Sequence, residues 1–299
     1  MHAGHPPAGT AGTADTLRSM SEAALIPTFE PGGAPISLLV DYDGTISRLD
    51  VGDTLLERLA VDQAEVARKD AQYDAGEVGS RELLRWDMDV LPDLPGALRA
   101  EAEAVEQDPG FVAIVRSVRA RGGVVEIVSD GLGFYIEANM RRMGLDDVPI
   151  ATNRNRLRGG AAGMDFPYGH LACFVCGTCK RQRVLTHQAA DRVVVFVGDG
   201  PSDRYAMHHA DLAFATGKLL AWCRAAGYPA TAWTELSEVA AWLEVAMADG
   251  TLPAHSKDVA AWRAAHRGPV RTPFLCGPEV WGEGRSIPPG RGDAGSLAV

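Results

Sequence analysis

Two aspartates stand one residue apart at the end of an apolar run, in the stretch SLLVDYDGT. Carboxylates as close as those of Asp41 and Asp43 repel each other, so keeping both there requires a cation or a proton-transfer role to offset the cost. Because residues i and i+2 of an extended strand point to the same side, both carboxylates would face the same ligand. The spacing therefore predicts chemistry at the end of a strand.

Other polar residues follow similar apolar, β-branched runs. The runs at 36–40, 124–128, 193–197 and 212–215 are typical of strands buried on both faces of a parallel sheet. Ligands gather at the carboxyl ends of such strands, so the residues just beyond the runs are the candidates for a site. They are Asp41, Asp43, Thr45, Ser129, Asp130, Gly131, Asp199 and Asp203, with Lys180 opening a helix ahead of the third run. Oxygen ligands and an amine suit magnesium and a phosphoryl group.

Helical patterns alternate with these runs, which predicts a doubly wound α/β domain with a parallel, Rossmann-like sheet. Residues 48–108 break the alternation, because they are rich in Ala, Leu, Glu and Arg at helical spacing and contain no convincing strand. We expect a small helical cap inserted after the first strand. The core would then comprise residues 35–47 and 109–250, between a flexible tail at 1–34 and a helical, then flexible, tail at 251–299.

Composition excludes several classes of protein. The 299 residues carry 29 Lys and Arg against 39 Asp and Glu, and a net charge of −10 disfavours binding to nucleic acid. No apolar stretch approaches the ~20 residues of a membrane helix, and the N-terminal sequence does not resemble a secretory signal. We expect a cytoplasmic protein that does not bind membranes and whose 5 cysteines stay reduced. The oligomeric state is left open.

The motifs DYDGT, VSD, a lysine before a helix and GDGPSD, in that order, resemble those of haloacid dehalogenase-superfamily phosphatases. The resemblance spans about residues 36–245. It implies that Asp41 is the nucleophile that forms an aspartyl phosphate and that Asp43 is the general acid and base. It also implies that Thr45 and the segment Ser129, Asp130 and Gly131 bind the phosphoryl group of a small-molecule phosphoester.

The same resemblance implies a magnesium site. The ion would lie between the Asp41 carboxylate, the Asp43 backbone carbonyl and Asp199, with Asp203 supporting it. Lys180 would add positive charge on the opposite side and stabilise the transferring group. This arrangement would offset the repulsion between the first two aspartates.

A helical insert after the first strand resembles the phosphoserine phosphatase-like branch of the superfamily, subfamily IB. Several stretches are similar to a phosphatase of methionine salvage that acts on 2-hydroxy-3-keto-5-methylthiopentenyl-1-phosphate. They are DVGDTLLERLA, GEVGSRELL, DPGF, MDFPYGH, CGTCKRQRV and FATGKLLAWCRAAG. Phosphoserine and other small phosphomonoesters stay open as substrates. So do two other functions: a phosphotransferase with the same intermediate, and a non-catalytic binding module on this fold.

The cap would exclude water and select the leaving group. Arg81 or Arg85 would bind a second anionic group of the substrate, and the other candidates are Asp50, Asp53, Glu57, Tyr73 and Trp86. An amphipathic bundle with solvated charges is the alternative.

A group of soft ligands precedes the motif lysine. The residues His170, Cys173, Cys176 and Cys179 recur every third position and form either a zinc site or a set of packed, reduced thiols. We expect Cys223 and Cys276 to be buried thiols.

Overall fold

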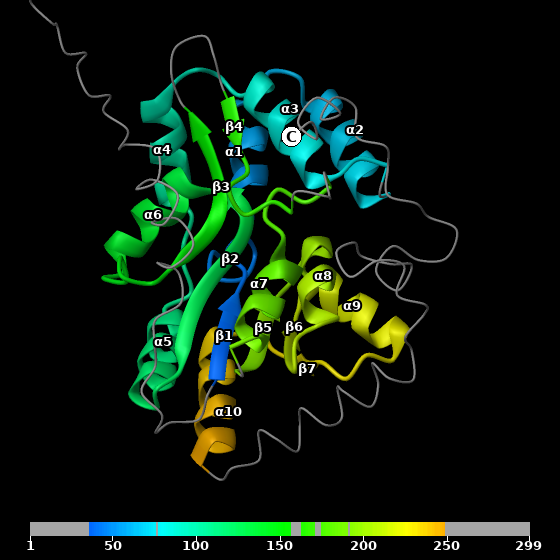
Figure 1. The fold of residues 1–299 in the computed structure, drawn as a ribbon. Coiled ribbons are helices and arrows are strands. Elements are labelled where there is room, and N and C mark those ends of the chain that lie inside the picture. The colour runs from blue at the N-terminus through cyan, green and yellow to red at the C-terminus, as the bar shows by residue number, and fades with distance from the viewer. Residues whose placement is uncertain (1–35, 76, 157–162, 171–174, 191, 249–299) are drawn as a thin grey trace, which may run out of the picture. The chain divides into compact units, whose positions relative to one another are not determined.

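The computed structural model describes residues 36–75, 77–156, 163–170, 175–190 and 192–248. In these ranges one sheet has the strand order β4-β3-β2-β1-β5-β6-β7, and every neighbouring pair is parallel except β3 with β4 (Figure 1). The strands are β1 (Ile36–Val40), β2 (Val124–Leu132), β3 (Ile150–Arg156), β4 (Gly163–Asp165), β5 (Val193–Gly198), β6 (Leu212–Ala215) and β7 (Thr231–Ala232). The predicted terminal tails lie outside the described residues.

Both faces of the central strands are buried, and successive side chains alternate between two apolar clusters. In β1, Leu38 and Val40 pack into one cluster and Leu39 into the other. In β5, Val195 belongs to the first cluster and Phe196 to the second. Period-two alternation with an apolar residue at every position is the pattern of a parallel sheet covered on both sides. The predicted doubly wound α/β fold is confirmed.

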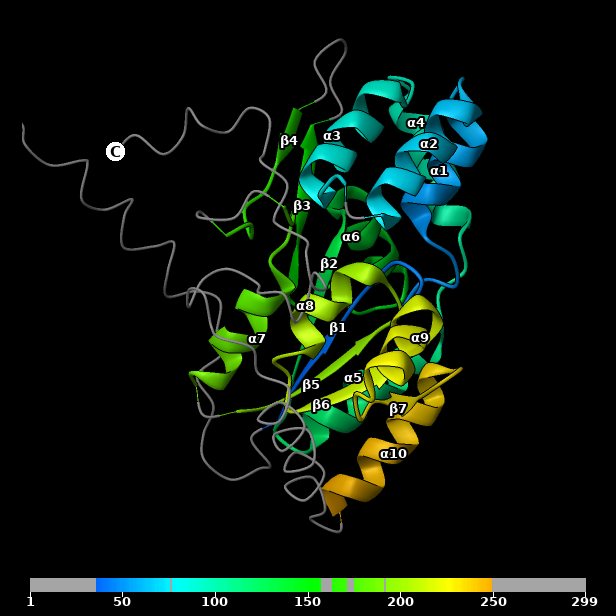
Figure 2. The same ribbon diagram turned by 90° about the vertical axis from the view of Figure 1, so that its right-hand side faces the viewer.

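Helices supply the two covers. Figure 1 shows α5 and α6 to the left of the strands, α8 and α9 to the right and α7 overlapping β5, and Figure 2 gives the view after a quarter turn. The first cluster is completed by α5 (Gly110–Ala120), α6 (Gly133–Arg142) and α10 (Leu236–Ala248). The second is completed by α7 (Lys180–Gln188), α8 (Arg204–Met207) and α9 (Gly217–Ala226), with a 3₁₀ turn η1 (Pro201–Asp203) ahead of α8. In the described ranges, no helix is both long enough and apolar enough to cross a membrane.

Four helices separate β1 from α5, and we call them the cap helices. They are α1 (Val51–Leu59), α2 (Gln63–Asp74), α3 (Ser80–Val90) and α4 (Pro95–Ala104), in the stretch where the sequence predicts an insert. The chain leaves and rejoins the core at one point: Ser47 and Gln107 form an antiparallel bridge, and Asp108 N donates to Ile46 O at 2.7 Å. Figure 1 places α1 to α3 beyond the carboxyl end of β1.

Three strands were not predicted from the sequence, and each lies toward an edge of the sheet. β3 carries the polar run NRNR, β4 has 3 residues and β7 has 2 exposed residues. β4 and β7 are the edge strands, and β3 pairs with β2 and β4 but has only a short apolar start before its polar run. None of the three carries the continuous apolar run used to find buried strands.

A buried charge network ties α7 to the sheet. Glu126 in β2 is 3% exposed and accepts two N–H groups from Arg183, each at 3.0 Å. Its second oxygen lies 2.7 Å from His187 Nε2, and His187 Nδ1 lies 2.9 Å from Ser37 Oγ in β1. Both Arg183 and His187 belong to α7, the helix that begins at Lys180. The network therefore fixes α7 against β1 and β2.

We expect Glu126→Gln to lower the free energy of unfolding by roughly 3 kcal/mol, because it leaves the buried Arg183 charge without a counter-charge. Urea denaturation at pH 7 measures this. The exposed Glu137→Gln on α6 is the control and should change stability by less than about 0.5 kcal/mol. Equal effects of the two substitutions would contradict the role given to Glu126.

Candidate active site

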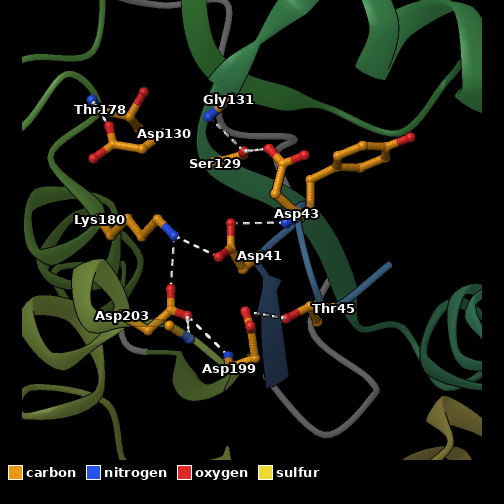
Figure 3. A network of polar contacts seen from close by, with 12 residues as sticks. Asp41, Asp43, Thr45, Ser129, Asp130, Gly131, Thr178, Lys180, Asp199 and Asp203 are labelled. Carbon is orange, nitrogen blue, oxygen red and sulfur yellow. Dashed lines mark hydrogen bonds and ion pairs between the residues drawn. The ribbon is translucent and has the colours of Figure 1, made fainter. Parts of the chain in front are cut away.

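The ammonium group of Lys180 lies between two carboxylates at the carboxyl edge of the sheet. Its Nζ is 2.8 Å from Asp41 Oδ2 and 2.6 Å from Asp203 Oδ1 (Figure 3). All three side chains are buried. Burial lowers the pKa of Lys180, but the attraction of Asp203 and Asp41 outweighs it and raises that pKa well above its ordinary value. The amine is therefore a permanent positive charge inside the protein.

Negative charge around Lys180 exceeds what one ammonium group can balance. Oxygen atoms of Asp41, Asp199 and Asp203 all lie within 4.8 Å of one another. Burial, together with repulsion from Asp203, raises the pKa of Asp41 well above its ordinary value, although Lys180 opposes this. Burial and Asp203 likewise raise the pKa of Asp199 to about 7. Three oxygen donors with uncompensated charge fit a hard divalent cation such as Mg²⁺.

Asp203 lies behind this cluster and shapes the loop after β5. Its Oδ2 accepts the backbone N–H groups of Asp199 and Gly200, both at 3.0 Å, while its Oδ1 binds Lys180. The side chain of Asp203 is fully buried and does not line the cavity, whereas Asp41 and Asp199 do. Its geometry suits the orientation of Lys180 and of the loop that carries Asp199.

The turn after β1 brings Asp199 close to the backbone. Gly44 has φ 71°, and a Cβ atom at this position would lie 2.4 Å from Asp199 Oδ2, so only glycine fits. Thr45 Oγ1 donates to Asp199 Oδ1 at 3.2 Å. The sequence predicted that Thr45 binds the phosphoryl group, but the structure does not place it on the cavity lining; it turns toward Asp199.

Asp43 is held in place by neutral donors. Its Oδ1 accepts Val51 N–H at 3.0 Å, its Oδ2 accepts Tyr135 O–H at 2.8 Å, and Ser129 Oγ lies 3.5 Å from Oδ2. Burial, followed by repulsion from Asp50, raises the pKa of Asp43 well above its ordinary value, so this carboxyl group favours its protonated form. Tyr135 was not identified as a site residue from the sequence, because a tyrosine in a helical pattern usually indicates an aromatic residue that packs in the core.

The end of β2 completes the core side of the site. Ser129, Asp130 and Gly131 all line the cavity, and Ser129 Oγ accepts Gly131 N–H at 2.8 Å. The Asp130 carboxylate accepts the backbone N–H of Thr178, two residues before Lys180. The carboxylate of Asp130 therefore anchors the loop that delivers Lys180.

A cavity of about 500 Å³ lies between this edge and the cap helices. Its lining includes Asp41, Asp43, Lys180 and Asp199 from the core. Among the cap candidates named from the sequence, Asp50, Asp53 and Tyr73 reach the cavity, whereas Glu57, Arg81, Arg85 and Trp86 are absent from its lining.

Arg81 and Arg85, predicted to bind a second anionic group of the substrate, contact other parts of the protein in this structure. Arg81 Nε donates to Cys176 O at 2.7 Å, and the guanidinium groups of both arginines lie over the ring of Phe166, 5.5 and 5.0 Å from its centroid. Both side chains therefore pack against the segment that precedes α7.

The predicted soft-ligand group is not gathered in the part of the chain that the structure describes. Cys176 and Cys179 are buried, and within the described residues no metal-ligating group joins them to His170. Cys173 and Cys276 lie outside the described residues. Cys223 is buried, as predicted.

Comparison with known proteins supports this geometry. The sequence model of the haloacid dehalogenase-like hydrolases matches residues 38–208. The chain belongs to this family. The matched region begins in β1 and ends just after α8, so it contains all four predicted motifs.

Similar curated proteins include a phosphoserine phosphatase of Archaeoglobus fulgidus, which is 25% identical over 182 residues. The match covers 60% of this chain but only 51% of that protein, so the chain spans about half its length. A 2-hydroxy-3-keto-5-methylthiopentenyl-1-phosphate phosphatase of Brevibacillus brevis is 26% identical over 191 residues, covering 60% of this chain and 81% of the relative.

Solved structures share the fold. A phosphoserine phosphatase solved as a phospho-aspartyl intermediate analogue has a TM-score of 0.55 and 19% identity, covering 71% of this chain and 99% of its own. A phosphoserine phosphatase from T. onnurineus has a TM-score of 0.54 and 17% identity, with 72% and 97% covered.

The cavity also holds Asp87 of α3, whose enclosure, with repulsion from Asp70, raises its pKa to about 8. An unfolded aspartate ionises near pH ~4. The folded state therefore binds more protons between these values, and ionisation of Asp87 costs stability increasingly as the pH rises toward 8.

We expect Asp87→Asn to raise the melting temperature, with a gain that is small at pH 5 and largest at pH 8. Thermal unfolding across this range, without divalent ions, measures it. The matched control is Asp89→Asn, an exposed residue of the same helix, which should show no such trend. A gain independent of pH would contradict the assignment.

Proposed function

We propose that the chain is a magnesium-dependent phosphatase that hydrolyses a small-molecule phosphomonoester through an aspartyl phosphate on Asp41. One observation carries the proposal: the Asp41 carboxylate lines the cavity, 2.8 Å from the buried ammonium of Lys180, with Asp43 two residues further on. A nucleophile, a fixed positive charge and an acid then face one phosphoryl group. Membership of the hydrolase family supports this reading.

The first step forms a bond between an Asp41 carboxylate oxygen and phosphorus while the bond from phosphorus to the leaving oxygen breaks. Asp43 is suited to donate a proton to that oxygen, because burial raises its pKa above the ordinary value and so favours the protonated form. In the second step, Asp43 as a carboxylate takes a proton from water, whose oxygen attacks phosphorus. Phosphate leaves and the Asp41 carboxylate is restored.

The residues present fit a magnesium ion at this edge. The carboxylates of Asp41 and Asp199 and the backbone carbonyl of Asp43 would hold it, with Asp203 behind them. When bound, the ion supplies positive charge that stabilises the phosphoryl oxygens. Lys180 supplies the opposing charge, and burial makes its contribution stronger than it would be in water.

The substrate class follows from the size of the cavity and from charge. A volume of about 500 Å³ suits a small molecule. A net charge of −10 disfavours a nucleic acid. Relatives named for phosphoserine and for a methylthiopentenyl phosphate support a small phosphomonoester without choosing between them.

The test is phosphate release from p-nitrophenyl phosphate and a panel of small phosphomonoesters, with Mg²⁺ and with a chelator. We expect magnesium-dependent turnover and, in Asp41→Asn, a loss on the order of 10³-fold or more, because the nucleophile is gone. Thermal unfolding checks that the variant folds. Turnover that persists in Asp41→Asn or in the chelator would overturn the proposal.

The substitution Tyr135→Phe tests whether the Tyr135 hydroxyl lowers the pKa of Asp43. The Tyr135 hydroxyl lowers the pKa of Asp43 by hydrogen bonding to its carboxylate, so its removal should raise that pKa further. We expect the alkaline limb of the kcat/KM profile to move to higher pH and the rate to fall by roughly tenfold.

The control for this experiment is Tyr228→Phe, which removes a buried hydroxyl that donates to Met207 O at 2.7 Å in the second apolar cluster. That variant should leave the pH profile in place. An unshifted pH profile in Tyr135→Phe would show that the Tyr135 hydroxyl does not influence the pKa of Asp43.

A further inference from the structure

The cap side of the cavity is lined by carboxylates. Asp53 comes from α1, Asp70 from α2 and Asp87 from α3, while Asp50 caps the N-terminus of α1. We call these four residues the acidic wall. They face the same cavity as Asp41 and Lys180, so a ligand whose phosphoryl group lies at Asp41 would extend toward them.

The described residues do not neutralise the acidic wall. In the described ranges, no ion pair involves any of its four members, whereas the neighbouring Asp74 is paired with Lys218 at 2.8 Å. The Oδ1 atom of Asp87 is buried and has no hydrogen-bond partner among the described residues. Lys180 and Lys218 are the only lysines or arginines in the described lining, and each already binds aspartates.

Repulsion within the acidic wall is substantial. Enclosure by the cavity, followed by repulsion from Asp50 and Asp70, raises the pKa of Asp53 to about 7. Asp87 is affected in the same way by Asp70, Asp53 and Asp50. Unpaired charges that destabilise a fold are kept where a ligand compensates them.

The spacing of the acidic wall argues against a second metal ion. Among the described residues, the group that brings metal-ligating oxygens within 4.8 Å of one another is Asp41, Asp199 and Asp203, and no three members of the wall do so. Carboxylates spread over three helices suit a larger cation with several N–H donors. Leu83, Leu84 and Leu91 also line the cavity and would contact its hydrocarbon part.

We propose that the leaving alcohol of the substrate carries one or more protonated amino groups and no anionic group, and that the acidic wall binds them. The inference rests on the proposed phosphatase function and narrows its substrate class. An anionic leaving group would face four carboxylates and no free cation of the described lining, so its binding would be unfavourable.

Matched substrates test the charge preference. The protein with Mg²⁺ is assayed with 2-aminoethyl phosphate, its neutral counterpart propyl phosphate and its anionic counterpart 2-phosphoglycolate, and with 4-aminobutyl phosphate against pentyl phosphate. We expect kcat/KM for each amine to exceed that of its neutral counterpart by about tenfold or more, and the anion to be the poorest substrate. A neutral or anionic substrate that matches or exceeds the amine would overturn the inference.

Substitutions test whether the acidic wall causes the preference for amine substrates. Asp53→Asn and Asp87→Asn should reduce kcat/KM for the amine about tenfold more than for propyl phosphate, because each removes one carboxylate from the wall. Asp89→Asn, on α3 but absent from the cavity lining, should leave the ratio unchanged. An amine preference that survives both wall substitutions would show that other groups select the substrate.

Two further arms separate this inference from the proposed function. Turnover of p-nitrophenyl phosphate that depends on Asp41 tests the phosphatase alone, so an active enzyme without amine preference overturns only the inference. If no substrate turns over, calorimetry with Asp41→Asn compares binding of 2-aminoethyl and propyl phosphate: tighter binding of the amine supports the wall, and equal binding overturns it. Loss of a second Mg²⁺ equivalent in Asp53→Asn, with no change in amine preference, would also overturn it.

Discussion

The ammonium of Lys180, shared between Asp41 and Asp203, is the interaction on which the site depends. Three buried charges in contact are costly unless their geometry is fixed, and the fold fixes each from a different direction. Asp41 directly follows β1, Asp203 ends the 3₁₀ turn after β5, and Lys180 is the first residue of α7. The Glu126 network holds α7 against the sheet from its other end. The apolar strands thus hold these charged groups together in the interior, where they would otherwise move apart or become hydrated.

The cavity contains two regions of negative charge that the protein treats differently. At the sheet edge, carboxylates are partly balanced by Lys180 and oriented by backbone N–H groups. At the cap helices, the four carboxylates of the acidic wall form no ion pair within the described residues. The arrangement at the sheet edge orients the carboxylate of Asp41. The repulsion within the acidic wall would be relieved when a cationic ligand binds. In the proposed function, separate parts of one cavity carry the reaction and select the substrate.

Much of the core site could be predicted from sequence, because the carboxyl ends of neighbouring parallel strands must meet. Asp41, Asp43 and Asp199 follow apolar runs and converge for that reason alone. The runs themselves are recognisable because both faces of the central strands are buried. The edge strands β4 and β7 lack that constraint and were not predicted, and β3 was not predicted because most of it is polar.

The contacts of the remaining side chains could not be predicted, because they depend on how distant parts of the chain pack together. Arg81 contacts Cys176, 95 residues away, and no local pattern indicates it. The phenol of Tyr135 reaches Asp43 across 92 residues. Asp70 and Asp87 were not singled out because the face that a cap helix turns to the cavity is set by how the helices pack. Thr45 was placed correctly beside the site, yet its hydroxyl direction follows from the approach of Asp199.

The bridge between Ser47 and Gln107 has a consequence for how such a protein can change. The backbone leaves the sheet and returns to it through paired residues, so the two ends of the insert are held together at the edge of the core. The entropy of closing a loop grows only with the logarithm of its length. The cap helices can therefore differ in length while the junction stays the same, provided that the Val51 N–H that holds Asp43 is kept.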